Sequence, residues 1–205
     1  MLEIQSLFPS PVFSEIVDDL DSDKLQKDKI IFKKIEHQGY NNLSEISEDK
    51  RILEKYLKLK KGLLNKWQDI AYNIFNYEND FEITTSWITR TKKGTESSIH
   101  LHKNSFFSGI FYYGKYTDAS GGVVFYNPLE QYSDYFLIPN SISQYTSTAH
   151  KFNPKTNLLL FFPSYLKHKI MYHQDRSLRY SLSFNIVPTG SYGLNDSAYN
   201  TGWLI

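Results

Sequence analysis

Two histidines, His100 and His102, alternate within the stretch SSIHLHKNSFFSGIFYY (residues 97–113), whose aromatic and β-branched residues are typical of strands. Side chains two residues apart on a strand point to the same side of the sheet, so both imidazoles would face one pocket. Two histidines in this arrangement, without a third ligand, are more often exposed polar residues than metal ligands. A third histidine, His168, follows the stretch FFPS. Three ligands on one face of a metal leave its opposite face open to other molecules, so the three histidines together indicate a metal site.

Arg179 and Ser181 form a second candidate group. Arg179 stands eleven residues beyond His168, at the start of the alternating segment RYSLSFNIV, and Ser181 is two residues further on. The two side chains would therefore share one face of a strand. A fixed guanidinium beside a hydroxyl can bind a carboxylate through two hydrogen bonds, which indicates an anion site next to the metal site.

Strands dominate the chain after about residue 80, and they must position these side chains. Short segments rich in β-branched and aromatic residues alternate with turn residues. Such a series predicts a sandwich, jelly roll or barrel with helices packed on one face. The predicted strands are residues 81–91, 106–116, 122–127, 134–139, 141–147, 157–162, 168–173 and 179–187.

Helices are predicted before residue 80. Ser22 can cap a helix that runs to about Gln38, where Gly39 would end it. Ser47 precedes two acidic residues and a long pattern of period near 3.6 that extends to Phe75, which predicts one long amphipathic helix. We expect a single domain over residues 1–205, with a helical part (1–80), a jelly-roll core (81–190) and a C-terminal extension (191–205).

Composition excludes several classes of function. The chain has no cysteine, so it has no disulfide, thiolate metal site or cysteine nucleophile. Its formal net charge of +1 argues against a surface that binds nucleic acid. The sequence has no evident signal peptide and no apolar run near the length of a membrane span, so a cytoplasmic protein without a membrane partner is expected. Ser164 has no nearby general base, which argues against a hydrolase.

The order of these motifs resembles a known family. The histidine pair followed by SGIFYY, then GGVVFYNP, LLLFFPSYLKH and RYSLSFN is similar to the 2-oxoglutarate–Fe(II) oxygenases of bacteria and phages. The early stretches SLFPSPVF and SWITRTKKG fit the same family, so the resemblance spans most of the chain. It implies a double-stranded β-helix, which is a jelly roll, and an oxidoreductase that uses Fe(II) and the cosubstrate 2-oxoglutarate.

The resemblance also implies roles for the candidate residues. His100, His102 and His168 would bind Fe(II), and Arg179 would pair with the distal carboxylate of 2-oxoglutarate, assisted by Ser181. Of the neighbours Tyr112 and Tyr113, which lie on opposite faces of a strand, Tyr112 is the residue expected to hydrogen-bond that carboxylate. The implied activity is that of a dioxygenase, a hydroxylase of a substrate that the sequence does not identify.

One position departs from the wider superfamily, which has a carboxylate where this chain has His102. Three arrangements are open. His102 is itself the second ligand; or His102 is the first ligand and Asn104 takes the carboxylate position; or a remote acid, Asp118 or Asp134, supplies the carboxylate. A site of three neutral imidazoles is one charge more positive than usual, which disfavours high-valent iron. Two alternative functions therefore stay open. The chain is a cupin-like metal-binding protein without oxygenase activity, or it is a non-enzymatic jelly-roll module.

Overall fold

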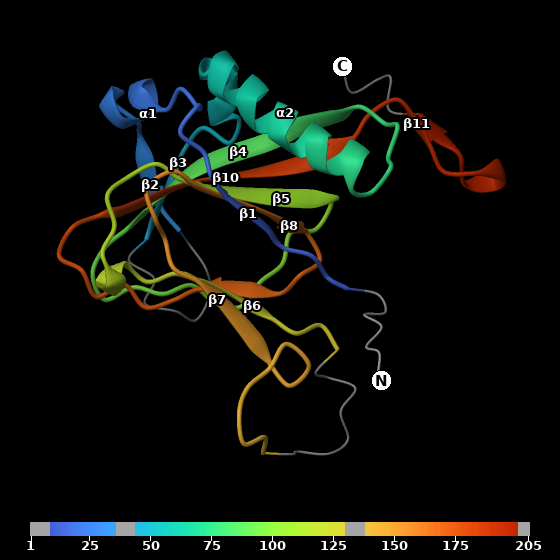
Figure 1. The fold of residues 1–205 in the computed structure, drawn as a ribbon. Helices are drawn as coiled ribbons and strands as arrows, with labels where there is room; N and C mark the ends of the chain where they lie inside the picture. The colour runs from blue at the N-terminus through green and yellow to red at the C-terminus, as the bar shows by residue number, and fades with distance from the viewer. Residues whose placement is uncertain (1–8, 36–43, 130–137, 201–205) are drawn as a thin grey trace.

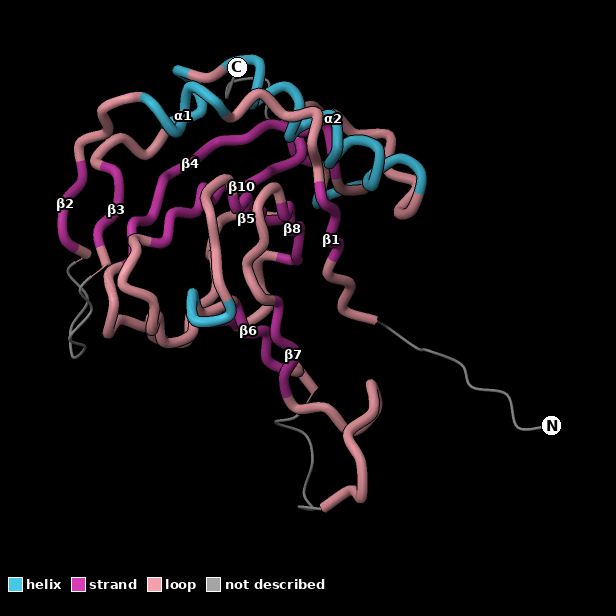
Figure 2. The backbone as a smooth tube through the Cα atoms, turned by 60° about the vertical axis from the view of Figure 1, so that its left-hand side comes forward, coloured by secondary structure: helices cyan, strands magenta, loops and turns pink. Residues whose placement is uncertain are grey.

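Two antiparallel sheets and a helical layer make up the fold. A computed structural model describes residues 9–35, 44–129 and 138–200. In it the major sheet has the strand order β1-β8-β5-β10-β4-β3-β2, and a minor sheet has the order β7-β6-β9. The helices cover one face of the major sheet, and β6 and β7 lie on its other side (Figures 1 and 2).

The strands of the two sheets have the following bounds: β1 (Phe13–Ile16), β2 (Phe32–Lys34), β3 (Glu45–Ser47), β4 (Phe81–Thr91), β5 (Phe107–Tyr112), β6 (Val123–Tyr126), β7 (Ala149–Phe152), β8 (Leu158–Pro163), β9 (His168–Ile170) and β10 (Arg179–Pro188). The helices are α1 (Asp23–Lys27) and α2 (Leu57–Asn73), with 3₁₀ turns η1 (Ile52–Lys55), η2 (Asp118–Ser120) and η4 (Asn195–Ser197). A hairpin of β11 (Ser191–Tyr192) and β12 (Tyr199–Asn200) follows the core.

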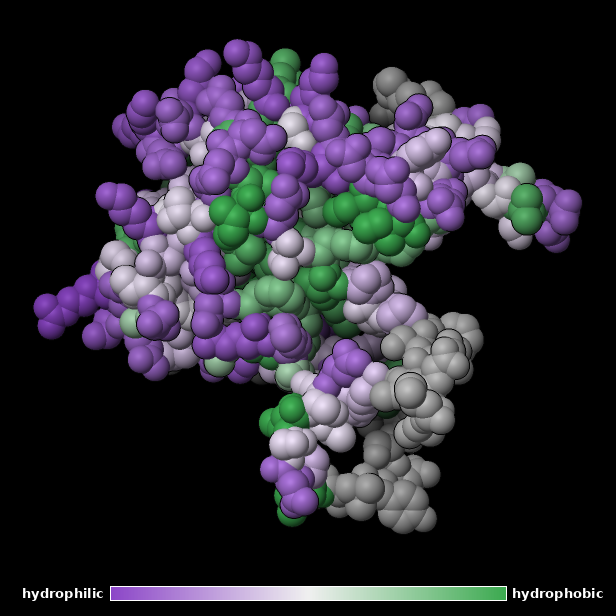
Figure 3. All heavy atoms as spheres, viewed as in Figure 1, coloured by the Kyte–Doolittle hydropathy of each residue, from purple (hydrophilic) through white to green (hydrophobic). Residues whose placement is uncertain are grey.

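Helix α2 buries one stripe of side chains against the major sheet. Leu59, Leu63, Trp67 and Ala71 recur every four residues, and each is at most 1% exposed. This spacing places them on one face of a helix. The ring of Trp67 packs on that of Phe107 of β5, with ring centroids 4.4 Å apart. The opposite face of the helical layer is mostly hydrophilic, and hydrophobic side chains gather beneath it (Figure 3).

Gly109 on β5 is required by the packing of this core. A Cβ atom at Gly109 would lie 2.1 Å from Cζ of Phe184 on the neighbouring strand β10. Phe184 is fully buried in the core cluster between the sheet and α2. Only a residue without a side chain leaves room for this ring.

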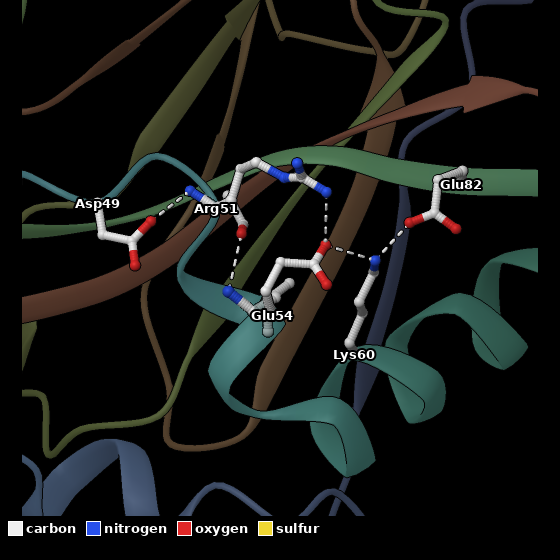
Figure 4. A network of polar contacts seen from close by, with 7 residues as sticks. Asp49, Arg51, Glu54, Lys60 and Glu82 are labelled. Carbon is white, nitrogen blue, oxygen red and sulfur yellow. Dashed lines mark hydrogen bonds and ion pairs between the residues drawn. The ribbon is translucent and has the colours of Figure 1, made fainter. Parts of the chain in front are cut away.

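A network of ion pairs ties α2 to the sheet. Lys60 of α2 contacts Glu54 of η1 at 2.8 Å and also pairs with Glu82 of β4 (Figure 4). Burial on its own would lower the pKa of Lys60, but the hydrogen bonds to the two glutamates outweigh it and raise the pKa. Arg51 joins the same network through Glu54 at 3.3 Å.

The predicted fold class is confirmed: the chain is mainly β, with antiparallel sheets and few helices. The predicted strands that correspond to β4, β5, β6, β8, β9 and β10 all form. No helix of the described ranges is both long and apolar enough to cross a bilayer.

The helix predicted from Ser22 to about Gln38 is wrong beyond Lys27. Ser22 makes no side-chain cap, and α1 has five residues. The run that follows forms β2, which pairs with β3 at the edge of the major sheet, so pairing with the sheet overrides the local helical pattern. Gly39, the predicted helix end, lies outside the described residues.

Ser47 does not begin a helix either. It ends β3, and its buried hydroxyl accepts a hydrogen bond from the Ile88 amide of β4 at 3.1 Å. The long predicted helix is instead the turn η1 followed by α2, with a break at Tyr56, whose backbone is not helical. The acids after Ser47 are thus part of a turn.

Two of the predicted strands lie in the segment between β6 and β7. Residues 141–147 form turns rather than a strand, because their side chains are mostly exposed and have no sheet neighbour to pair with. The predicted strand 134–139 falls mainly outside the described residues.

Candidate metal centre

A cavity of about 410 Å³ opens between the major sheet and the segment 97–102, which runs beside β9. Alternate residues of β10 form its floor: Arg179, Ser181, Ser183 and Asn185. The neighbouring strand β4 contributes Trp87, Thr89 and Thr91, which pair in register with the first three of these. The volume falls in the usual range of small-molecule sites.

His100, His102 and His168 meet at this cavity. His100 and His168 face each other in an antiparallel bridge, and each backbone N–H donates to the carbonyl of the other at 2.9 Å. The His102 amide donates to the Ser164 carbonyl at 2.9 Å. One ring nitrogen from each histidine lies within 4.8 Å of the others, a group that could hold a metal ion.

Each of the three rings has its Nδ1 atom engaged by the protein. Nδ1 of His100 lies 3.0 Å from the Ser98 carbonyl, and Nδ1 of His168 lies 2.9 Å from the Leu166 carbonyl. Nδ1 of His102 lies 2.8 Å from Oδ1 of Asn185. Carbonyl oxygens only accept, so each Nδ1 carries the proton and each Nε2 is unprotonated. The tautomer needed for metal binding through Nε2 is thereby set at all three rings.

Burial also keeps two of the rings neutral. Burial, together with the neighbouring His100, lowers the pKa of His168 to about 3. Burial lowers the pKa of His102 to about 4, although the hydrogen bond to Asn185 acts in the opposite direction. Neutral imidazole is the form that binds a metal, so both rings are in the binding form at pH 7.

The alternative ligands that the structure describes, Asp118 and Asn104, are not part of this group. Asp118 is exposed at the start of η2, and the candidate ligand group of the described residues contains only the three histidines. Asn104 is exposed in a turn with a positive φ of 60°. Asp134 lies outside the described residues. The structure therefore brings together the three histidines and no acid within its described part.

Arg179 is buried at the inner end of the cavity, 1% exposed. Its Nη1 donates to the Gly121 carbonyl at 3.1 Å and its Nη2 to Oγ1 of Thr91 at 2.8 Å. Its Nε has no hydrogen-bond partner among the described residues. Burial lowers the pKa of Arg179, while the neighbouring hydroxyls of Tyr112 and Tyr116 act against this.

The Gly121 carbonyl can approach Arg179 because the residue is glycine. Its φ is 62°, and a Cβ atom would lie 2.6 Å from the Met171 carbonyl oxygen. A side chain here would meet backbone, which cannot move aside easily. The stretch GGVVFYNP therefore contributes a backbone contact to the anion site.

Ser181 lines the cavity beside Arg179, whereas Tyr112 is not among the residues that line it. Tyr112 is fully buried in a second core cluster between the sheets, and its hydroxyl has no partner in the described structure. Burial raises the pKa of Tyr112, and the nearby Arg179 guanidinium partly offsets this. Ser181 is 4% exposed and lines the cavity. An unpartnered hydroxyl and an unpartnered guanidinium N–H close together are donors that a carboxylate would satisfy.

Three further residues belong to the site or its surroundings. Trp87 lines the cavity, where its ring lies 5.5 Å from that of His102. His173 is fully buried, with Nδ1 2.9 Å from the Ser120 carbonyl. Asn185 was not singled out, although its period-two spacing from Arg179 places it on the cavity face.

The part of the chain that holds the candidate site matches a known family. The family model described as "Putative 2OG-Fe(II) oxygenase" matches residues 85–185, the part of the chain that carries every candidate site residue. No curated protein matches the chain.

Three solved structures share the fold. HygX from Streptomyces hygroscopicus, crystallised with nickel, 2-oxoglutarate and hygromycin B, has a TM-score of 0.57 at 10% identity and covers 88% of this chain and 84% of its own. The epimerase SnoN from nogalamycin biosynthesis, described as α-ketoglutarate-dependent, has a TM-score of 0.56 at 7% identity, covering 83% and 72%. A prolyl hydroxylase from Trichoplax adhaerens has a TM-score of 0.51 at 14% identity, covering 80% and 73%. Residues 85–185 thus match the 2OG-Fe(II) oxygenase family, and the match together with the shared double-stranded β-helix indicates an Fe(II)- and 2-oxoglutarate-dependent oxygenase.

Proposed function

We propose that this oxygenase is a hydroxylase whose Fe(II) is bound by Nε2 of His100, His102 and His168. The observation that carries the assignment is the engagement of all three Nδ1 atoms, which leaves Nε2 unprotonated on each of three rings that lie together. Neutral imidazoles suit Fe(II), which supports the donor set. With 2-oxoglutarate, iron supplies the oxidation of a substrate C–H bond coupled to decarboxylation of the cosubstrate.

Arg179 is proposed to bind the distal carboxylate of 2-oxoglutarate. Its guanidinium has an unpartnered Nε–H, and no acid of the described residues pairs with it. A buried cation without an anion is costly, so a carboxylate bound there removes a penalty already present in the fold. Tyr112 and Ser181 supply the hydroxyls that complete the site.

The remaining walls of the cavity would position the substrate and exclude water. Its apolar lining residues are Ile46, Trp87, Leu101, Ile110 and Ile170. These side chains are apolar, so a bound substrate would be held in a dry site, which strengthens the polar contacts within it.

Replacement of Arg179 by Met tests this function. The variant keeps a side chain of similar length but lacks the donors, so it should bind Fe(II) as wild type does and 2-oxoglutarate at least tenfold more weakly, as measured by calorimetry under anaerobic conditions. Metal binding without any cosubstrate binding in the wild-type protein would instead favour a metal-binding protein of another kind. The all-histidine donor set, which is more positive than a set with a carboxylate, is the feature that favours that second candidate.

A further inference from the structure

His102 differs from the other two histidines in what its Nδ1 contacts. His100 and His168 contact backbone carbonyls, whereas His102 contacts two side chains. These are Oδ1 of Asn185 and Oγ of Ser108, each 2.8 Å from Nδ1. His102 is also the residue that stands where the wider superfamily has a carboxylate ligand.

Asn185 is held in place by an irregularity of the sheet. The register between β10 and β4 shifts between Asn185 and Ile186, because Asn185 pairs with Thr85 while Ile186 pairs with Ile83. Such a bulge redirects the side chains beside it. Nδ2 of Asn185 donates to Oγ1 of Thr85 at 2.9 Å, so Oδ1 is turned toward His102.

A chain of serine hydroxyls continues from Ser108 away from His102. Oγ of Ser105 donates to the Phe107 carbonyl at 2.9 Å, and it accepts a hydrogen bond from Ser164 at 3.0 Å. The hydroxyls of Ser164 and Ser108 lie 2.8 Å apart. Oγ of Ser108 donates to Oδ1 of Asn185 at 2.9 Å, because an amide oxygen only accepts, and so it presents a lone pair to Nδ1–H of His102.

We propose that Asn185 and Ser108 are positioning residues that orient His102 and strengthen it as a metal ligand. Two acceptors on Nδ1–H increase the electron density that the ring offers through Nε2, and they fix the ring plane. Asn185 and Ser108 do not bind the metal themselves, but through His102 they increase the electron density at the metal, as a carboxylate ligand would. The proposal rests on the proposed metal site.

Binding of Co(II) to the metal-free protein, followed by calorimetry and by the visible spectrum, tests it. Asn185→Leu keeps the side-chain volume and removes the acceptor, so its Co(II) affinity should fall about 10- to 100-fold. Asn185→Asp can only accept, so it should bind Co(II) at least as tightly as wild type. Ser108→Ala should show a smaller loss of Co(II) affinity. It replaces Asn185→Leu as the test variant if Asn185→Leu does not fold. Ser86→Ala is the matched control, because Ser86 is a buried serine whose hydroxyl accepts from the Leu53 amide and which does not line the cavity.

The reduction potential of the iron-loaded protein separates positioning from a merely structural role. The extra negative charge in Asn185→Asp should lower the Fe(III)/Fe(II) midpoint potential below that of wild type. Wild-type Co(II) affinity in Asn185→Leu, or an equal loss in Asn185→Asp and Asn185→Leu, would overturn the proposal. His168→Ala distinguishes this failure from failure of the site: if His168→Ala loses Co(II) and Asn185→Leu does not, the metal site stands and only the role of Asn185 falls.

Discussion

His100 and His168, 68 residues apart in the chain, exchange both backbone hydrogen bonds of an antiparallel bridge at 2.9 Å, and their rings lie 4.4 Å apart. The bridge places the two side chains on the same side of the backbone pair, at the mouth of the cavity. Main-chain pairing therefore fixes their separation before any metal binds, so the donor set is preorganised.

Removal of His168 should abolish most metal affinity. His168→Ala takes away one of three neutral ligands and leaves the other two, so we expect the dissociation constant for Fe(II) or Co(II) to rise at least 100-fold. His150→Ala is the control, since His150 is an exposed histidine on β7 and is not part of the group. Undiminished metal binding in His168→Ala would show that the third ligand is another residue.

Acid should destabilise the metal-free protein because two of the histidines are buried in their neutral form. The pKa of a histidine in the unfolded chain is near 6.5, whereas burial lowers it to about 4 in His102 and to about 3 in His168. Between pH 6.5 and about 4 the unfolded chain binds protons that the folded chain does not. The free energy of unfolding should therefore fall as the pH falls, by up to about 1.4 kcal/mol per pH unit for each histidine.

Urea unfolding at pH 7.5, 6 and 5 in the presence of a chelator measures this dependence. In His168→Gln one of the two buried histidines is absent. The slope of the free energy of unfolding against pH should therefore be shallower by up to about 1.4 kcal/mol per pH unit, which corresponds to one proton. Identical slopes in the variant and the wild type would show that His168 is not buried as a neutral ring.

Much of the site follows from period-two spacing, which is a local property of strands. His100 with His102, and Arg179 with Ser181, share a face because residues two apart on extended chain always do. Six of the eight strands predicted after residue 80 form, and they too were predicted from this local pattern, whereas β7 was not predicted. Asn185 lies on the same face as Arg179 and was available to the same argument.

The N-terminal part was harder to predict because its pairing is non-local. Segment 32–34 is a strand only because β3 is beside it, and Ser47 is buried only because β4 donates to its hydroxyl. Burial of His173 depends on the backbone of η2, which lies some 50 residues earlier in the chain. Such contacts leave no signal in the local pattern of residues.

The packing of Gly109 predicts a large loss of stability on a small substitution. Gly109→Ala would place a methyl group 2.1 Å from Cζ of Phe184, within a core that has no room to shift. Overpacking of this kind costs about 1–3 kcal/mol or more. Chemical denaturation of Gly109→Ala should show a lower unfolding midpoint. Gly114→Ala should lose less stability, because the atom nearest to its Cβ would be the Tyr116 hydroxyl oxygen, 3.2 Å away. Equal losses in the two variants would contradict the packing argument.

The most direct test of the account is anaerobic reconstitution with Fe(II), followed by addition of 2-oxoglutarate while the visible charge-transfer band of the iron-bound cosubstrate is recorded. We expect the band in the wild-type protein, its loss in His168→Ala, where iron is not bound, and its loss in Arg179→Met, where iron is bound but the cosubstrate is not. Iron binding without a band in the wild type would contradict the account, because the three histidines would then hold a metal that does not bind 2-oxoglutarate.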